Sequence, residues 1–406
     1  MTKRARSDSE PLHIAMIGTR GVPAAYGGFE TAVEEIGRRL VARGHKVTVY
    51  CRSNDGPRPA EYLGMDLVYR PAVRSKAIET LSHTFFSVAH AVSHRRPDMA
   101  FVFNAANSPF VPVLHLRGIP SAVHVDGLEW KRDKWGGAGR RYYRMAEGRA
   151  VHSADALIAD AQGIADYYAS EFAVPTELIT YGAPILTDPG SSRLAELGLE
   201  PGRFHLVVAR FEPENHVDVI VEGYGLSDAR YPLVVVGSAP YSAEYTESIA
   251  SMAAADQRVR MLGGVFDQEL LDQLYANALT YLHGHSVGGT NPSLLRSMGA
   301  GTAVIAYDVV FNHDVLGDDG VYFDSVNSVG DQIMRAEAGE AQQRDRGLRL
   351  QQRASERYDW DDVAALYENL ARRLADGASI RGIGSRRRRD SEWSARPDAH
   401  AQTAEV

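Results

Sequence analysis

Residues 288–298, with the sequence GGTNPSLLRSM, have the residue types and order of an anion-binding turn. Gly288 and Gly289 allow a ligand to approach the backbone closely. Asn291 is a natural helix N-cap, and Pro292 suits the first helical position. The N–H groups at the start of such a helix bind anions, so the stretch predicts a phosphate-bearing ligand. A tight turn without a ligand is the alternative, because Gly-rich turns between a strand and a helix are common.

Arg210 is a second candidate, because it comes directly after an apolar strand predicted at residues 204–209. A guanidinium group is permanently charged and can bind two oxygens at once, which suits a diphosphate. The alternative is an ion pair with Glu212 or Glu214. Gly237 follows the next predicted strand and should lie at the same edge of the sheet.

A cluster of polar and aromatic residues, 126–132, follows a strand predicted at residues 121–125. The carboxylates of Asp126 and Glu129 can accept hydrogen bonds from hydroxyl groups, and Trp130 can stack on a sugar face. This mixture predicts a polyol site, and a charged surface loop is the alternative.

Two further polar residues lie within or directly after predicted strands of the first half. Asn104 follows the strand predicted at residues 99–103, at the edge where open α/β sheets bind ligands. His124 lies within a strand, so we expect it to pack or to form a hydrogen bond rather than to catalyse.

A long Gly-rich loop, residues 18–28, follows the first predicted strand. Its spacing does not form the GxGxxG fingerprint of dinucleotide sites, and Cys51-Arg52 stand where an NAD site favours an acid. These features disfavour an NAD-dependent oxidoreductase. Gly27 and Gly28 end the loop at a helix start, which indicates a loop that covers a ligand. Glu30, in the first turn of that helix, suits the helix dipole.

Strands and helices alternate in both halves of the chain, which predicts two doubly wound, Rossmann-like α/β domains. The carboxyl ends of the two sheets can face one another across a cleft. The predicted organisation is a disordered N-terminus at 1–11, a first domain at 12–183, a second domain at 184–358, a C-terminal helix at 359–375 that packs back towards the first domain, and a disordered basic tail at 376–406.

Composition limits the classes of function. The 406 residues are 44% hydrophobic and 24% charged, as in a globular protein, and the net charge of −8 argues against a nucleic-acid partner. Cys51 is the only cysteine, which excludes an intramolecular disulfide, and we expect it to be buried. No apolar run is long enough to cross a bilayer, so the cytoplasm is the expected location. Four arginines at 386–389 suggest peripheral contact with anionic lipid at the inner face of the membrane, with a merely solvated tail as the alternative.

Taken together, four ordered motifs resemble the family-four retaining glycosyltransferases of the GT-B fold, in particular a bacterial rhamnosyltransferase-like branch that builds cell-surface polysaccharide. The resemblance covers nearly all of residues 12–372. The motifs are residues 18–31, residues 126–132, Arg210 with residues 212–216, and residues 288–295.

The resemblance implies a nucleotide-sugar donor held by the second domain, an acceptor held by the first, and no required metal or cofactor. It implies that the protein contributes positioning and charge stabilisation while the leaving diphosphate helps to take the acceptor proton. The residues expected to take part in catalysis are Arg210 and Asp126. The expected donor-binding residues are Gly27, Gly28, Arg210, Asn215, Gly237, Gly289, Thr290, Asn291 and Arg296. The expected acceptor-binding residues are Tyr26, Asn104, Glu129, Trp130 and Lys131.

The sequence departs from the family pattern at three places. Many relatives carry two glutamates where this chain has Gly288 and Arg296, and the second usually accepts the ribose hydroxyls. Arg296 has no acceptor capacity, so either it contacts phosphate instead or the ribose is bound weakly. Asn215 stands where a lysine usually accompanies Arg210. Val125 stands where many relatives have a histidine, so no catalytic histidine is assigned.

The expected function is therefore retaining transfer of a sugar, L-rhamnose first among the candidates, from dTDP-L-rhamnose or a UDP-sugar to a glycan or a lipid-linked glycan. The alternative, favoured by Arg296, is a catalytically impaired relative that binds sugar nucleotides as an assembly partner.

Overall fold

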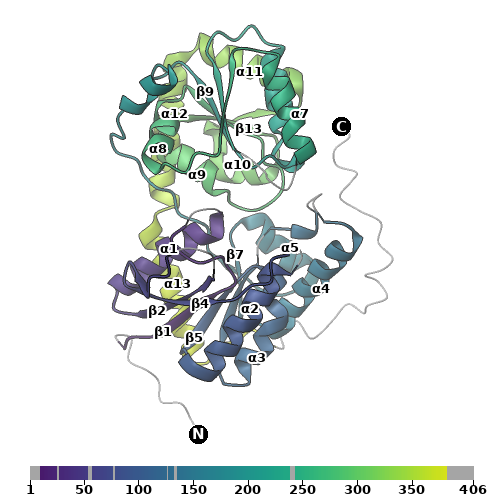
Figure 1. Cartoon of the computed structure of the whole chain (residues 1–406), viewed down its shortest axis with the longest axis vertical. Helices are drawn as coiled ribbons and strands as arrows, with labels where there is room; N and C mark the ends of the chain where they lie inside the picture. Colours follow the sequence, from purple (N-terminus) through teal and green to yellow (C-terminus); the bar gives the residue numbers. More distant parts are fainter. Residues whose placement is uncertain are drawn as a thin grey trace.

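The computed structural model describes residues 10–24, 27–53, 57–75, 78–125, 127–131, 135–237 and 243–381. It has two α/β domains, one above the other in Figure 1, each with a central sheet covered by helices. Both sheets are parallel except at one edge of the first. The prediction of two doubly wound domains is therefore confirmed.

The first sheet has eight strands in the order β3-β4-β2-β1-β5-β6-β7-β8. Its central strands β5 and β6 are buried along their whole length and are mostly apolar, as parallel sheets between two helix layers require. The bounds are β1 (His13–Ile17), β2 (Lys46–Arg52), β3 (Glu61–Tyr62), β4 (Met65–Arg70), β5 (Met99–Phe103), β6 (Ser121–Val125), β7 (Ala156–Ala159) and β8 (Glu177–Leu178).

Helices from the same half of the described chain cover this sheet. Helix α1 buries Val33, Ile36 and Leu40 along one stripe, as its apolar spacing predicts. The bounds are α1 (Gly28–Ala42), α2 (Glu79–His90), α3 (Val111–His115), α4 (Gly137–Ser153) and α5 (Gln162–Phe172). Cys51 at the end of β2 is buried, as expected.

The second sheet has six parallel strands in the order β11-β10-β9-β12-β13-β14. Strands β10 and β11 are added on one side of β9 and strands β12 to β14 on the other, so the order of the strands switches between β9 and β12. This is the position at which ligands enter open α/β sheets. The bounds are β9 (His205–Val208), β10 (Leu233–Val236), β11 (Val259–Gly263), β12 (Thr280–His283), β13 (Ala303–Tyr307) and β14 (Val321–Phe323). Its helices are α6 (Val217–Gly225), α7 (Ala243–Ala254), α8 (Gln268–Asn277), α9 (Pro292–Gly299), α10 (Val310–Leu316), α11 (Val326–Ala338) and α12 (Glu340–Arg357).

The last helix, α13 (Trp360–Ala375), returns to the first domain. Its Tyr367 ring packs edge-on against Phe101 of β5, with ring centres 4.9 Å apart. The two segments that connect the domains lie side by side, since the Ala183 N–H donates to the Tyr358 carbonyl at 2.7 Å. A single apolar core cluster therefore runs from the first domain through this junction into the second.

Candidate active site

The turn before α9 has the local structure that its sequence predicts. Asn291 is the N-cap, and its Oδ1 accepts hydrogen bonds from the Ser293 N–H at 2.9 Å and from the Ser293 hydroxyl at 2.7 Å. Tyr281 of β12 in turn donates to the Ser293 hydroxyl at 2.9 Å. Pro292 is the first helical residue. The helix start is thus fixed to the buried strand behind it.

The start of α1 in the first domain faces the start of α9 in the second. A Cβ atom placed on Gly28 would lie 2.9 Å from Cγ of Pro292, so only glycine permits this approach. Gly27 precedes it with a φ of 111°, a conformation that glycine adopts without strain. Because a helix start carries partial positive charge, two such starts that meet favour an anion bound beside their contact.

The domains also touch directly beside these helix starts. The Thr290 hydroxyl donates to the main-chain carbonyl of Asp160, which follows β7, at 2.5 Å. A Cβ on Gly289 would lie 2.1 Å from Oδ1 of Asp160, and a Cβ on Gly127 would lie 2.5 Å from Cα of Gly288. The structure therefore brings the glycines of the predicted donor turn to the junction of the two domains.

Arg210 follows β9 at the carboxyl edge of the second sheet, with about a third of its side chain exposed (37%). Its Nη2 lies 3.5 Å from Oε2 of the buried Glu212, so the ion pair considered from the sequence is present but long. The Asn215 side chain is buried and donates to the Arg210 carbonyl at 2.8 Å. Asn215 thus holds the loop that carries Arg210, a positioning contact that does not need a ligand.

Gly237 supports the same loop from the neighbouring strand. Its φ is 154°, and a Cβ there would lie 1.8 Å from the Ala209 carbonyl oxygen. The close approach of two backbones explains why glycine is needed at this position.

A group of histidines at this edge was not predicted. His283, at the end of β12, is fully buried and stacks on His285 with ring centres 4.4 Å apart. Burial lowers the pKa of His283 to about 3, so its ring is neutral. His216 stacks on Tyr307 at 4.0 Å and bonds the Gly284 carbonyl at 2.8 Å. The alternation of Tyr281, His283 and His285 was the available signal.

Arg296 does not reach the α9 start. Its Nε and Nη2 lie 3.0 and 2.8 Å from Oδ1 of Asp272 on α8. The side chains of both residues are about one-fifth exposed. The predicted phosphate contact of Arg296 would require this ion pair to open.

The predicted acceptor residues are only partly within the described chain. Asp126 and Tyr26 lie outside the described residues, and so does the side chain of Lys131. Asn104 has a φ of 71°, and its Oδ1 accepts from the Ala106 N–H, so it caps a local turn.

Glu129 and Trp130 lie in an aromatic cluster on the first domain. Glu129 is buried and accepts from the Trp135 indole N–H at 3.0 Å. The Arg144 guanidinium lies over the Trp130 ring, 4.2 Å from its centre. Glu147, also in this cluster, accepts from the Tyr167 hydroxyl at 3.1 Å, and burial raises the pKa of its carboxyl to about 7. These groups are engaged with one another here, so the acceptor role of Glu129 and Trp130 stays a prediction.

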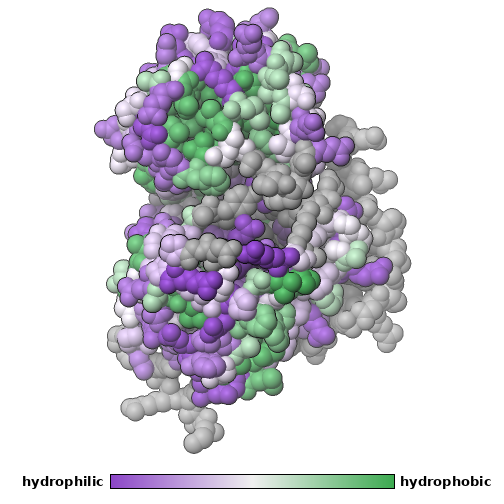
Figure 2. Space-filling model, viewed as in Figure 1, coloured by the Kyte–Doolittle hydropathy of each residue, from purple (hydrophilic) through white to green (hydrophobic). Residues whose placement is uncertain are grey.

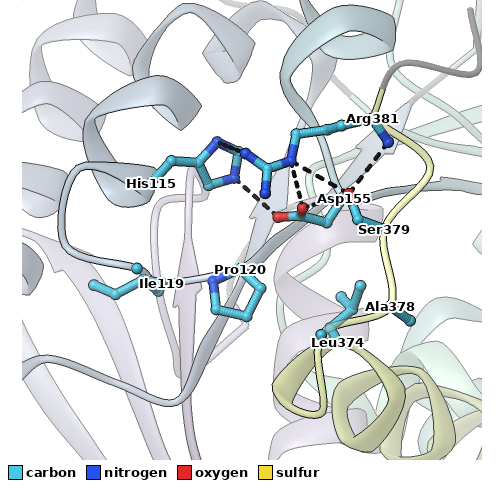
Figure 3. Close-up of a pocket in the computed structure, with 10 residues that line it drawn as sticks. His115, Ile119, Pro120, Asp155, Leu374, Ala378, Ser379 and Arg381 are labelled. Carbon is cyan, nitrogen blue, oxygen red and sulfur yellow. Dashed lines mark hydrogen bonds and ion pairs between the residues drawn. The ribbon is translucent and has the colours of Figure 1, made fainter. Parts of the chain in front are cut away.

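A separate pocket, shown in Figure 3, lies at the amino edge of β6 and β7, away from the carboxyl edge. Asp155 accepts from His115 at 2.9 Å and from the Ser379 hydroxyl at 2.7 Å, and its Oδ1 lies 2.7 Å from Nε of Arg381. Burial opposes ionisation of Asp155, but these hydrogen bonds outweigh it and lower its pKa. Residues 376–381, predicted as the start of the tail, therefore lie against the first domain.

Comparison with known proteins agrees with this architecture. Residues 203–337 match the family described as glycosyl transferases group 1, and residues 12–184 match a domain of unknown function, DUF1972. The O-antigen chain mannosyltransferase B of Escherichia coli is 24% identical over 139 residues, 33% of this chain. The matched part spans 36% of that relative's length.

Two solved structures share the fold across both domains. Sucrose-phosphate synthase from Thermosynechococcus elongatus superposes with a TM-score of 0.75 at 22% identity, covering 89% of this chain and 99% of that one. Anabaena HepE in complex with UDP-glucose superposes with a TM-score of 0.72 at 15% identity, with the same coverage. The fold is GT-B. Together with the glycosyl transferases group 1 domain in the second half, it supports a GT-B glycosyltransferase.

Proposed function

We propose that this chain is a retaining hexosyltransferase that moves a sugar from a nucleoside diphosphate to a glycan or lipid-linked glycan in cell-surface polysaccharide synthesis. L-rhamnose is the proposed sugar, with dTDP-L-rhamnose or a UDP-sugar as donor. A cytoplasmic site of action belongs to this proposal. The observation that carries it is the meeting of two helix starts, at Gly28 and Pro292, where a diphosphate would be stabilised.

The names of the relatives support the donor class. HepE was solved with UDP-glucose, and the Escherichia coli relative is a mannosyltransferase, so both point to activated hexoses. Rhamnose rests on the resemblance of the motifs and on the departure at Arg296, since a deoxyribose has one hydroxyl fewer to bind.

In the proposed reaction, the bond from the sugar C1 to the diphosphate oxygen breaks, and a bond from C1 to the acceptor oxygen forms on the same face. The acceptor proton passes to the leaving diphosphate. No metal or cofactor takes part. Arg210 and the N–H groups of the two helix starts would stabilise the charge that develops on the diphosphate. Asp126 and the Glu129–Trp130 turn would orient the acceptor hydroxyl.

The second candidate is a sugar-nucleotide-binding relative without turnover. The Arg296–Asp272 ion pair favours it, because the position that usually supplies a ribose acceptor is held by a cation with its own partner.

A thermal-shift screen of nucleoside diphosphates and their sugars, followed by assays of donor hydrolysis and transfer, tests both candidates. A bound donor raises the melting temperature by mass action. Binding with turnover supports the transferase, and binding without turnover supports the second candidate. Failure of every nucleotide to bind would contradict both.

A further inference from the structure

Helix α2 has its apolar and polar residues on the unexpected sides. Three of the four residues on its buried face, His83, Thr84 and Ser87, are polar, and the fourth is Val88. Phe85 and Phe86 are instead exposed, Phe85 at 54%. A helix on a globular domain normally buries its apolar stripe and exposes its polar residues. The reversed pattern marks α2 as a surface that contacts something other than water.

The neighbouring helix extends the same surface. The Phe85 ring lies 5.3 Å from the Phe86 ring and 6.3 Å from the ring of Phe110, directly before α3. On and after α3, Val113 is exposed and Leu116 is 83% exposed. In Figure 2, hydrophobic atoms gather on the lower domain over the position that α2 and α3 take in Figure 1. We call this area the α2–α3 face.

The surroundings of this face are cationic although the whole chain has a net charge of −8. Helix α4 packs beside α3 and adds the exposed Met145. The acids of residues 79–125 and 135–154 are Glu79, Asp98 and Glu147. The arginines of the same segments are Arg95, Arg96, Arg117, Arg140, Arg141, Arg144 and Arg149.

One of these arginines, Arg95, is neutralised by Asp66 of β4 at 3.1 Å, but the acids of these segments do not cancel the rest. Glu147 is buried, and Glu79 is ion-paired with Arg52 at 2.9 Å. Arg96, Arg117, Arg141 and Arg149 are all exposed.

We propose that the α2–α3 face, with the arginines around it, docks the protein on an anionic lipid bilayer. Apolar side chains that insert at the headgroup level and cations that pair with anionic lipids are the two forces that hold proteins on such a surface. Exposed aromatic and aliphatic groups on α2 and α3, with exposed arginines in the same segments and on the adjoining α4, supply both.

The position of this face fits the proposed reaction, on whose lipid-linked acceptor the inference rests. The start of α2 lies at the carboxyl edge of the first sheet, because Arg52 at the end of β2 binds Glu79 and also the Thr80 hydroxyl at 2.8 Å. A bilayer against α2 and α3 would therefore present a lipid-linked acceptor beside the edge where the acceptor residues lie.

The test is flotation of the full chain with vesicles of phosphatidylcholine, with and without about a third phosphatidylglycerol. We expect binding only to the anionic vesicles. The double variants Phe85→Ser/Phe86→Ser and Arg117→Glu/Arg141→Glu should each reduce the bound fraction at least about tenfold. The first removes the apolar side chains that insert into the headgroup region, and the second removes two cations that contribute about 1 kcal/mol each. The double variant Leu348→Ser/Arg344→Glu, on the exposed side of α12, is the matched control and should bind as the wild type does.

The melting temperature and nucleotide binding of each variant are measured in parallel, without vesicles. Unchanged values show that the variants are folded and that the donor site is intact, so loss of vesicle binding would be specific to this face. Vesicle binding that both α2–α3 variants retain would overturn the inference, because it would then come from another part of the chain. Failure of all nucleotides to bind would contradict the proposed function and leave the vesicle result to be judged on its own.

Discussion

The Thr290 hydroxyl of the second domain donates to the main-chain carbonyl of Asp160 in the first. Gly289 lies against the side chain of the same aspartate. The turn expected to bind the donor is thus also the place where the domains meet, so ligand binding and domain closure would depend on the same few atoms.

Replacement of Gly289 by alanine tests this dependence. The new methyl group would overlap the Asp160 carboxylate, so the domain junction must rearrange around it, and we expect the Kd for a nucleoside diphosphate to rise at least about tenfold because the two helix starts are no longer held in place. Isothermal titration calorimetry measures the affinity. Gly148→Ala on α4 is the matched control, since a Cβ there meets open space. It should leave the affinity unchanged and add about 0.5–1 kcal/mol to the free energy of unfolding. Equal affinities for both variants would contradict the role of the Gly289 contact.

Removal of the Arg210 guanidinium should impair catalysis more than folding. Its side chain is partly exposed, but its ion-pair partner Glu212 is buried, so Arg210→Ala should also lower the melting temperature, and turnover is compared at a temperature where both proteins are folded. Turnover of the donor should fall at least about tenfold, as loss of a charge-stabilising donor predicts. Steady-state kinetics with Arg344→Ala as control measures this. Wild-type turnover would remove Arg210 from the site.

The Arg296–Asp272 pair links α9 to α8 and should be detectable by charge reversal. Arg296→Glu alone places two carboxylates together and should lower the free energy of unfolding by about 1 kcal/mol. Adding Asp272→Arg should restore at least half of the loss. Urea denaturation of the single and double variants measures the coupling. Additive losses would show that the pair contributes nothing to stability.

The buried carboxyl of Glu147 predicts a specific pH dependence. Its pKa is raised by burial from an ordinary value of 4.5 to about 7, so the folded protein holds a proton that the unfolded chain has released between these pH values. Stability should therefore fall as pH rises from about 4.5 to 7, by at most about 3 kcal/mol, and then level off.

Comparison of the wild type with Glu147→Gln isolates this effect. The variant should lack the fall, whereas Glu247→Gln, on the exposed side of α7, should keep it. Chemical denaturation at several pH values supplies the data. Parallel curves for the wild type and Glu147→Gln would contradict the raised pKa.

Local sequence signals predicted the elements that a single apolar run or cap defines. Strands β5 and β6 begin and end at the predicted residues, and α9 begins at Pro292 behind its Asn291 cap. In contrast, α11 and α12 were not predicted. The buried stripe of α12 includes Gln343 and Gly347, so its apolar periodicity is too broken to be read from the sequence.

The site was predictable only where it depends on one segment. The donor turn and the position of Arg210 follow from residues next to one another in the chain. The partner of Arg296 depends on how α8 packs against α9, and the approach of Gly127 to Gly288 depends on how two domains meet. Neither relationship leaves a local pattern. Asn215 was predicted as a donor ligand, and that role stays a prediction. Its contact with the Arg210 carbonyl could not be predicted, because it too leaves no local pattern in the sequence.

The return of α13 has a consequence for biosynthesis. Ribosomes deliver the N-terminal domain first, yet Phe101 in the middle of its sheet is covered by Tyr367, near the end of the chain. The first domain cannot complete its interior while the second is still being translated. A nascent chain of this protein would therefore expose an apolar strip until α13 has been translated, which would favour binding by ribosome-associated chaperones.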